Sequence, residues 1–113
     1  MRTIMYIVNT SFMVEPPVHE RWYDLFVHQV IPFLREAGFG ENEEHPRRII
    51  FSRVLTNSGD PHYTYSLQVE VPDTAEYQRF MQEVMGEYQT IALSLFGEQV
   101  VHFTSLLKTI DLS

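Results

Sequence analysis

Residues 62–97 decide the fold, and they read HYTYSLQVEVPDTAEYQRFMQEVMGEYQTIALSLFG. In the first ten positions, apolar or aromatic residues alternate with polar ones, which is the pattern of a strand with one buried face. Pro72 ends that strand, because proline supplies no N–H to a sheet. Asp73, with Glu76 three residues later, fits a capping box at the start of a helix. The sequence therefore predicts a strand over 62–71 and a helix directly after it.

The predicted helix after Asp73 carries the strongest periodic signal in the chain. Its apolar side chains recur every three or four residues. They are Tyr77, Phe80, Met81, Val84, Tyr88, Ile91, Ala92 and Leu95. Gly97 supplies a helix stop, and the residues that follow it predict a last strand over 99–110.

The residues before this stretch repeat the strand–helix order. Residues 3–14 are rich in β-branched and aromatic residues, which favour a strand, and Pro16 ends it. An apolar stripe at helical spacing then predicts a helix over 18–37. Pro32 is expected to kink this helix or to split off its last turn, and Gly38 is expected to stop it.

The segment that joins the two halves predicts a loop and a further strand. Residues 40–46 form a polar, acidic loop, and 47–57 return to strand character. The turn signal Ser58-Gly59-Asp60 follows, so this strand is expected to pair antiparallel with 62–71. The whole order is β-α-β-β-α-β, which predicts a ferredoxin-like α+β domain with an antiparallel four-stranded sheet and two helices on one face.

Composition and charge restrict the expected partners. With 113 residues, a single domain over 1–113 is expected, and a net charge of −7 argues against nucleic acid and anionic membranes. The absence of cysteine excludes disulfides, thiolate nucleophiles and cysteine-ligated metals. No apolar run is long enough to span a bilayer and no signal peptide is apparent, so a cytoplasmic location is predicted. Arg47, Arg48 and Arg53 are interpreted as a solvated strand end, with a local anion contact as the alternative.

Both faces of the predicted sheet carry apolar residues. In the last strand, Val101, Phe103 and Leu107 share one face, while Val100 and Leu106 share the other. A ferredoxin-like domain that stands alone exposes a polar face. The second face is therefore expected to be covered by a second copy of the chain across a two-fold axis. A monomer with a few exposed apolar residues is the alternative.

Short motifs in a fixed order carry a family resemblance. They are Met5-Tyr6-Ile7-Val8-Asn9, Trp22, Ile31-Pro32, Gly38-Phe39, Arg53-Val54-Leu55, Tyr65-Ser66-Leu67-Gln68, Phe96-Gly97 and Phe103-Thr104-Ser105-Leu106-Leu107. Over residues 5–110 the chain resembles the DUF4286 family of small bacterial proteins, common in Bacteroidetes. Such proteins are similar to dimeric α+β barrel proteins, a superfamily that includes cofactor-free monooxygenases and haem enzymes. The resemblance implies a fold and a homodimer more than it implies a reaction.

Two positions depart from the family pattern. Val30 stands directly before Ile31-Pro32, where relatives often carry histidine, and Thr104 stands in the last strand where they often carry arginine. His28 lies two residues before Val30 on the predicted helix, which places it on another face. If either family residue takes part in chemistry, this chain has lost it, so the resemblance gives an enzyme less support.

Strand alternation predicts a candidate ligand pocket. Polar residues share a face in the first, third and last strands: Asn9 and Ser11, Ser66 and Gln68, and His102 and Thr104. If these faces coincide, they line one cavity on the side of the sheet away from the helices, and Arg53 could add an anion contact. A polar-decorated dimer interface uses the same residue types and is the alternative.

The histidines form no sequence pattern of metal ligands, and no metal or cofactor is expected. His19, His45 and His62 fall at element ends or in loops, where exposed polar residues are usual. His102 falls in mid-strand and is interpreted as hydrogen-bonded or partly exposed, with haem ligation as a further possibility. Trp22 is interpreted as core because it lies on a helical stripe.

Two classes of function remain from the sequence. The first is a homodimeric module, formed through the sheet face, that binds a small molecule or a protein. The alternative is a cofactor-independent oxygenase- or isomerase-like enzyme, with its site in the cavity between the sheet and its dimer mate. His102, Asn9 and Gln68 are the residues that motivate the enzyme. The two differ in whether a titratable group faces that cavity.

Overall fold

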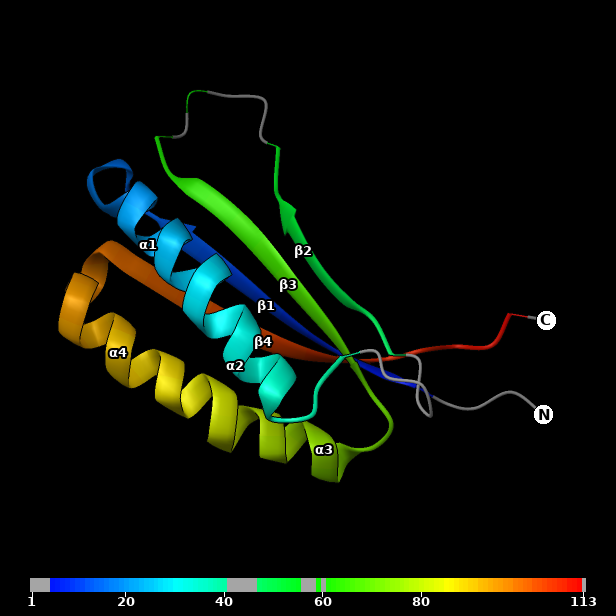
Figure 1. Ribbon diagram of the computed structural model, residues 1–113. Coiled ribbons are helices and arrows are strands. Elements are labelled where there is room, and N and C mark those ends of the chain that lie inside the picture. Colours follow the sequence, from blue (N-terminus) through cyan, green and yellow to red (C-terminus); the bar gives the residue numbers. More distant parts are fainter. Residues whose placement is uncertain (1–4, 41–46, 56–58, 60, 113) are drawn as a thin grey trace.

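The computed structural model describes residues 5–40, 47–55, 59 and 61–112, and its elements follow the predicted order (Figure 1). The strands are β1 (Tyr6–Val14), β2 (Ile49–Arg53), β3 (Tyr63–Val71) and β4 (Val100–Lys108). They form one sheet in the order β2-β3-β1-β4, with every neighbouring pair antiparallel. The predicted turn at 58–60 and loop at 40–46 lie largely outside the described residues.

Two helical runs cover one face of this sheet (Figure 1). The first consists of η1 (Pro16–Val18), α1 (His19–Leu25), the π-helical segment η2 (Phe26–Val30) and α2 (Ile31–Glu36). The second consists of α3 (Thr74–Arg79), the π-helical segment η3 (Phe80–Met85), α4 (Gly86–Phe96) and the short turn η4 (Gly97–Gln99). The predicted fold class, an α+β ferredoxin-like sandwich, is confirmed.

Pro32 marks a change of helical register rather than an end of the helix. The α-helix resumes at Ile31, so Pro32 falls in the first turn of α2, where its missing N–H is best tolerated. The residues just before it form η2, whose wider hydrogen-bonding pattern is typical of an interrupted α-helix. The last turn is therefore not split off at Pro32, because the helix continues through it to Glu36.

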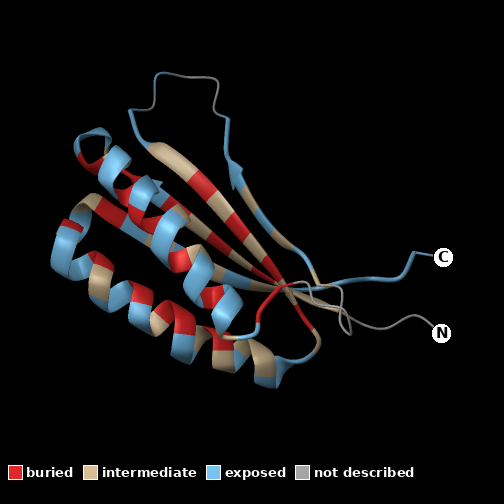
Figure 2. Cartoon of the chain, in the orientation of Figure 1, coloured by how far each residue is buried: buried red, intermediate tan, exposed pale blue. Residues whose placement is uncertain are grey.

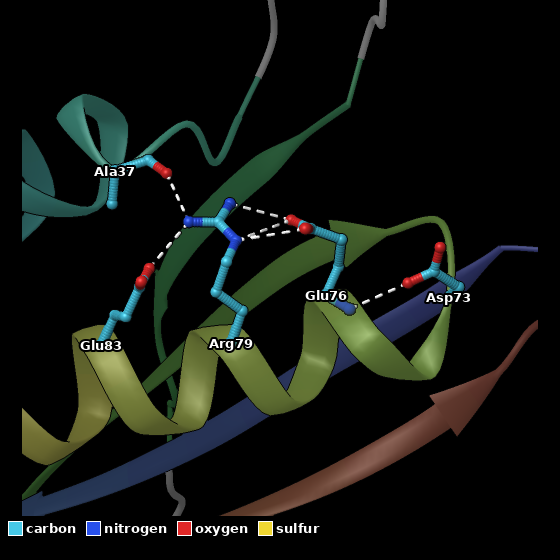
Figure 3. Close-up of polar contacts among 5 residues, drawn as sticks. All are labelled: Ala37, Asp73, Glu76, Arg79 and Glu83. Carbon is cyan, nitrogen blue, oxygen red and sulfur yellow. Dashed lines mark hydrogen bonds and ion pairs between the residues drawn. The ribbon is translucent and has the colours of Figure 1, made fainter.

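The predicted cap at Asp73 is half of a capping box. The Asp73 carboxylate accepts a hydrogen bond of 2.8 Å from the Glu76 backbone N–H. The Glu76 side chain turns to Arg79 instead of returning to the cap (Figure 3). Arg79 also donates to the Ala37 carbonyl, at 2.7 Å, and to the Glu83 carboxylate, at 2.8 Å. This arginine therefore joins the end of the first helical run to the start of the second.

The core lies between the helices and the sheet, and buried positions gather on the inner side of the helices (Figure 2). Phe12, on the central strand β1, has its ring centre 5.5 Å from that of Trp22, 4.9 Å from that of Phe26 and 5.3 Å from that of Tyr88. The fully buried Trp22 indole donates a 2.9 Å hydrogen bond to the Tyr88 hydroxyl. The prediction that Trp22 belongs to the core is confirmed.

Candidate functional site

The sheet face away from the helices carries a row of polar side chains at its centre. Residues opposite each other in an antiparallel pair point to the same face, and here Asn9 lies opposite Gln68 and Ser11 opposite Ser66. The Ser66 hydroxyl donates a 2.9 Å hydrogen bond to the Asn9 side-chain oxygen. Four of the residues predicted to line a pocket therefore do lie together on one face, which we call the open face.

An apolar strip borders this row along β4. Odd-numbered β4 residues lie opposite odd-numbered β1 residues, so Met13 and Val101 are opposite each other, as are Ser11 and Phe103. The Phe103 side chain is 61% exposed and Val101 is 47% exposed. Among the strand residues of the structure, Glu70 is the charged one on this face. The open face is thus uncharged over most of its area and apolar at one side.

His102 and Thr104 do not lie on the open face, which corrects the predicted pocket. They stand opposite Phe12 and Thr10, whose side chains point toward the helices. The Thr104 hydroxyl is hydrogen-bonded to that of the buried Thr10 at 2.9 Å. The prediction was wrong because β4 has apolar residues on both faces, so its alternation could be matched to β1 in either phase.

His102 is a half-buried packing residue in the described structure. Its ring centre lies 6.0 Å from that of Phe12 and 5.5 Å from that of Tyr88. Burial lowers the pKa of His102, which favours the neutral imidazole. Burial likewise raises the pKa of Tyr88 to about 12, against the opposing effect of its hydrogen bond from Trp22. This histidine therefore does not face a space between two sheets.

Arg53 belongs to a different site, at the edge of the sheet beside α1. It lies opposite Tyr65, on the face that points toward the helices. Together with His19, Tyr23, Phe51 and Tyr65 it lines a cleft of about 340 Å³, which we call the aromatic cleft. Arg47 and Arg48 line a separate cleft with Arg35, so the three arginines grouped in the sequence do not line one cleft.

A histidine–tyrosine pair forms one wall of the aromatic cleft. The His19 Nε2 atom lies 2.7 Å from the Tyr65 hydroxyl, with the donor set by the histidine tautomer. The His19 ring is stacked on Tyr63, with ring centres 3.7 Å apart and planes 5° apart. The Arg53 guanidinium lies 4.9 Å from the centre of the same Tyr63 ring. The Arg53 guanidinium, the His19 imidazole and the Tyr65 hydroxyl thus lie close together in the lining of the cleft.

The electrostatics of this pair favour neutral partners. Burial first, and then the Arg53 charge, lower the pKa of His19, while Glu20 acts in the opposite direction. Burial raises the pKa of Tyr65, which Arg53 opposes. A neutral imidazole bonded to a neutral phenol can exchange or relay a proton with a bound ligand, and Arg53 can hold a negative charge beside it.

The sequence did not point to this cleft. From the sequence, His19 is expected only as an exposed residue at an element end, and Tyr65 only as an apolar strand position. The available signal was the tyrosine pair Tyr63 and Tyr65 in one strand face, near a histidine that follows two prolines at a helix start. The distance of 46 residues between His19 and Tyr65 hides their contact from local patterns.

Val30, the other position that departs from the family pattern besides Thr104, lies between the two helical runs. It lines an apolar cleft of about 160 Å³ with Leu25, Phe33 and Tyr88 among its other walls. A histidine at this position would face that cleft instead of the open face. Val30 itself is buried and adds only packing there.

Neither metal ligation nor a membrane span is visible in the residues that the structure describes. No group of three histidine or acidic side chains is placed to hold a metal ion within those residues. Across the same described ranges, none of the helices is both long and apolar enough to cross a bilayer.

Comparisons with known proteins agree with the fold. A crystal structure of a dimeric ferredoxin-like protein from an uncultured marine organism is 15% identical, with a TM-score of 0.65, over 99% of this chain and 100% of that one. The de novo designed protein Foldit4 is 8% identical, with a TM-score of 0.56, over 95% of this chain and 98% of that one. No curated protein matches the sequence. The model of the family described as a domain of unknown function, DUF4286, matches residues 5–110, and the chain therefore belongs to the DUF4286 family.

Proposed function

We propose that the chain is a homodimeric binding module whose two open faces pack against each other across a two-fold axis. The observation that carries the proposal is the exposed apolar strip on a sheet face that none of the described helices covers. Met13, Val101, Phe103 and Leu107 form this strip, and all four are more than 40% exposed in the single chain. Apolar residues grouped on an exposed face, with few charges among them, are typical of the centre of an interface.

A second copy of the same chain is the occupant that fits this face best. Packing two sheets face to face buries the apolar strips of both copies and keeps the interface self-complementary. The similar solved structure is described as dimeric, which supports the same assembly here. A like-charged partner is not repelled at this face, because Glu70 is its one charged residue among the described strand positions.

The polar row gives the interface its binding function in this proposal. Asn9, Ser11, Ser66 and Gln68 lie at the centre of the sheet and would lose water when two sheets pack. Polar groups that lose water need new hydrogen bonds, either to the partner copy or to a small ligand between the sheets. Asn9 accepts from Ser66, which leaves the amide hydrogens of Asn9 for such a bond.

The open face supports a binding module better than an enzyme. Acid–base chemistry needs a titratable group of suitable pKa that faces the substrate. The histidine proposed for that role, His102, faces the helices instead. Glu70 remains, but its carboxylate accepts a 2.6 Å hydrogen bond from the Arg48 backbone N–H at the edge of the sheet.

A cytoplasmic location stays a prediction.

Light scattering coupled to size-exclusion chromatography tests the assembly. The wild type is expected to have twice the 13.3 kDa mass of one chain at micromolar concentration. Phe103→Glu would bury two charges at the two-fold interface without partners, so the dimer is expected to weaken by at least about a hundredfold and to elute as a monomer.

Leu93→Glu is the matched control for this experiment. Leu93 is 58% exposed on α4, close to the 61% of Phe103, but it lies in the helical layer. It should leave the dimer intact. A monomeric wild type would refute the proposal, and so would a dimer that Leu93→Glu separates and Phe103→Glu does not.

Asn9→Ala then distinguishes the two uses of the polar row. If Asn9 bonds to the partner copy, the variant is expected to weaken the dimer by about tenfold, the loss typical of one hydrogen bond. If the row lines a space for a ligand, the dimer constant stays the same. Gln89→Ala is the control, because Gln89 is an exposed polar residue of α4 and lies in the helical layer, away from the open face.

A further inference from the structure

The aromatic cleft has a shape and a lining that the open-face module does not use. Its volume of about 340 Å³ is at the lower end of the roughly 300–1,000 Å³ that small-molecule sites occupy. Its lining residues come from α1, β2 and β3, and β2 is an edge strand of the sheet. A ligand the size of a single ring with one polar substituent is the kind of occupant that this volume fits.

Three aromatic side chains give the cleft flat walls. Phe51 is stacked with Tyr65, with ring centres 5.2 Å apart and planes 14° apart. Tyr23 lies 6.3 Å from Phe51 and 5.8 Å from Tyr65, measured between ring centres. Tyr23 is 42% exposed, so part of its side chain is accessible to a ligand. Aromatic rings pack at such distances against further rings, which favours a planar aromatic ligand.

Arg53 supplies a positive charge at the polar side of the same cleft. Within the described residues, no carboxylate forms an ion pair with Arg53, and its guanidinium lies 4.9 Å from the centre of the Tyr63 ring. A guanidinium presents paired N–H groups that match a carboxylate. The chain carries a net charge of −7, so an arginine that forms no ion pair among the described residues is an exception to its acidic character.

We infer that the aromatic cleft binds a small aromatic carboxylate, with its ring against Tyr23 and Phe51 and its carboxylate on Arg53. His19 and Tyr65 then lie at the boundary between ring and carboxylate, where their 2.7 Å hydrogen bond can open toward an oxygen of the ligand. The site uses the face of the sheet opposite to the proposed dimer interface, so it does not depend on dimerisation.

Benzoate is the probe, added to the full chain and followed by two-dimensional NMR. The expected result is saturable shifts confined to residues around Tyr23, Phe51 and Arg53, reached by about 10 mM, because a single-ring ligand has few atoms with which to bind. Benzamide keeps the ring without the charge and is expected to bind at least about tenfold more weakly. Cyclohexanecarboxylate keeps the charge without the aromatic ring and is also expected to bind more weakly.

Two arginine variants give the decisive comparison. Arg53→Gln removes the charge from the cleft and should weaken benzoate by about tenfold or more. Arg21→Gln is the matched control, since Arg21 is also exposed and also lies over an aromatic ring, 5.5 Å from the centre of Phe96, outside the cleft. It should leave benzoate affinity within about twofold.

Tyr23→Leu is a second variant, which tests the ring contact with the ligand separately from the charge of Arg53. Tyr23 is exposed enough for the fold to tolerate this change, and the loss of its ring should weaken benzoate severalfold. The inference is overturned if benzoate causes no saturable shifts, if the shifts lie elsewhere, if benzamide binds equally well, or if Arg53→Gln and Arg21→Gln have the same effect.

Discussion

Replacing Arg79 with methionine tests the contact that joins the two helical runs. The Arg79 guanidinium donates to the Ala37 carbonyl at 2.7 Å, to Glu76 at 2.8 Å and to Glu83 at 2.8 Å (Figure 3). It also lies 4.2 Å from the centre of the Phe39 ring. Methionine keeps the apolar stem over Phe39 and removes the charge and every donor.

The expected loss of stability follows from these contacts one by one. A hydrogen bond from a charged donor contributes about 1.5–3 kcal/mol, and the lower end applies because the Arg79 side chain is 32% exposed. Each ion pair within the helix adds about 0.3–0.5 kcal/mol, and the contact with Phe39 adds about 0.5–1 kcal/mol. Since such contributions are not additive, we expect a loss of about 2 kcal/mol. For a domain of this size, that lowers Tm by about 8 °C.

Thermal unfolding followed by the fluorescence of Trp22, the single tryptophan, measures this loss, and circular dichroism checks it. In about 1 M salt the ion pairs are screened, so the difference from wild type should shrink without vanishing. The control is Arg21→Met, because among the described residues Arg21 has a contact with the Phe96 ring to lose and no ion pair. If Arg21→Met lowers Tm as much as Arg79→Met does, the reasoning is refuted.

Two further predictions concern the core. Tyr88→Phe leaves the buried Trp22 indole N–H without its acceptor, so the free energy of unfolding should fall by about 1–3 kcal/mol, whereas Tyr77→Phe on the same helical run should change it by less than about 0.5 kcal/mol. An equal effect of both variants in urea unfolding would contradict the assigned bond. Because burial lowers the pKa of His102 in the folded chain, the unfolded chain binds that proton more tightly. Stability should therefore fall as the pH drops from the ordinary value of 6.5 through the folded pKa, and His102→Gln should reduce the slope of Tm against pH in that window. An unchanged slope would show that the proton on His102 has no part in it.

The elements were predictable where local chemistry and long-range packing agree. The alternation over 63–71 and the cap at Asp73 each depend on neighbouring residues, and the structure has both. The order of the elements then restricts the topology, because short connections and right-handed crossovers leave few arrangements. The boundaries differ by a few residues: the strand predicted over 47–57 is Ile49–Arg53 in the structure, although the Val54 N–H just beyond it still donates to the Thr64 carbonyl at 2.8 Å.

The face of β4 was not predictable in the same way. A strand of period two fixes which residues share a face but not which face points inward. In β4 the exposed Phe103 and Val101 are larger apolar residues than the inward-facing Thr104, so size alone favours the wrong phase. Thr104 can point inward because Thr10 lies opposite it and shares a 2.9 Å hydrogen bond with its hydroxyl, a fact of register that the sequence of one strand does not contain.

The two proposed sites are physically separate, and this separation gives each proposal its own test. Side chains of one strand point alternately to the two faces, so Ser52 lies on the open face while Phe51 and Arg53, on either side of it, line the aromatic cleft. A second copy packed on the open face covers Ser66 and leaves Tyr65 in contact with His19 on the helical side. A failure of the dimer therefore leaves the ligand inference standing, and a failure of benzoate binding leaves the dimer standing. If Phe103→Glu, the variant that separates the dimer, also lost benzoate binding, a change of packing on the open face would have to reach the aromatic cleft through the β2–β3 edge. The two sites could then no longer be treated as independent.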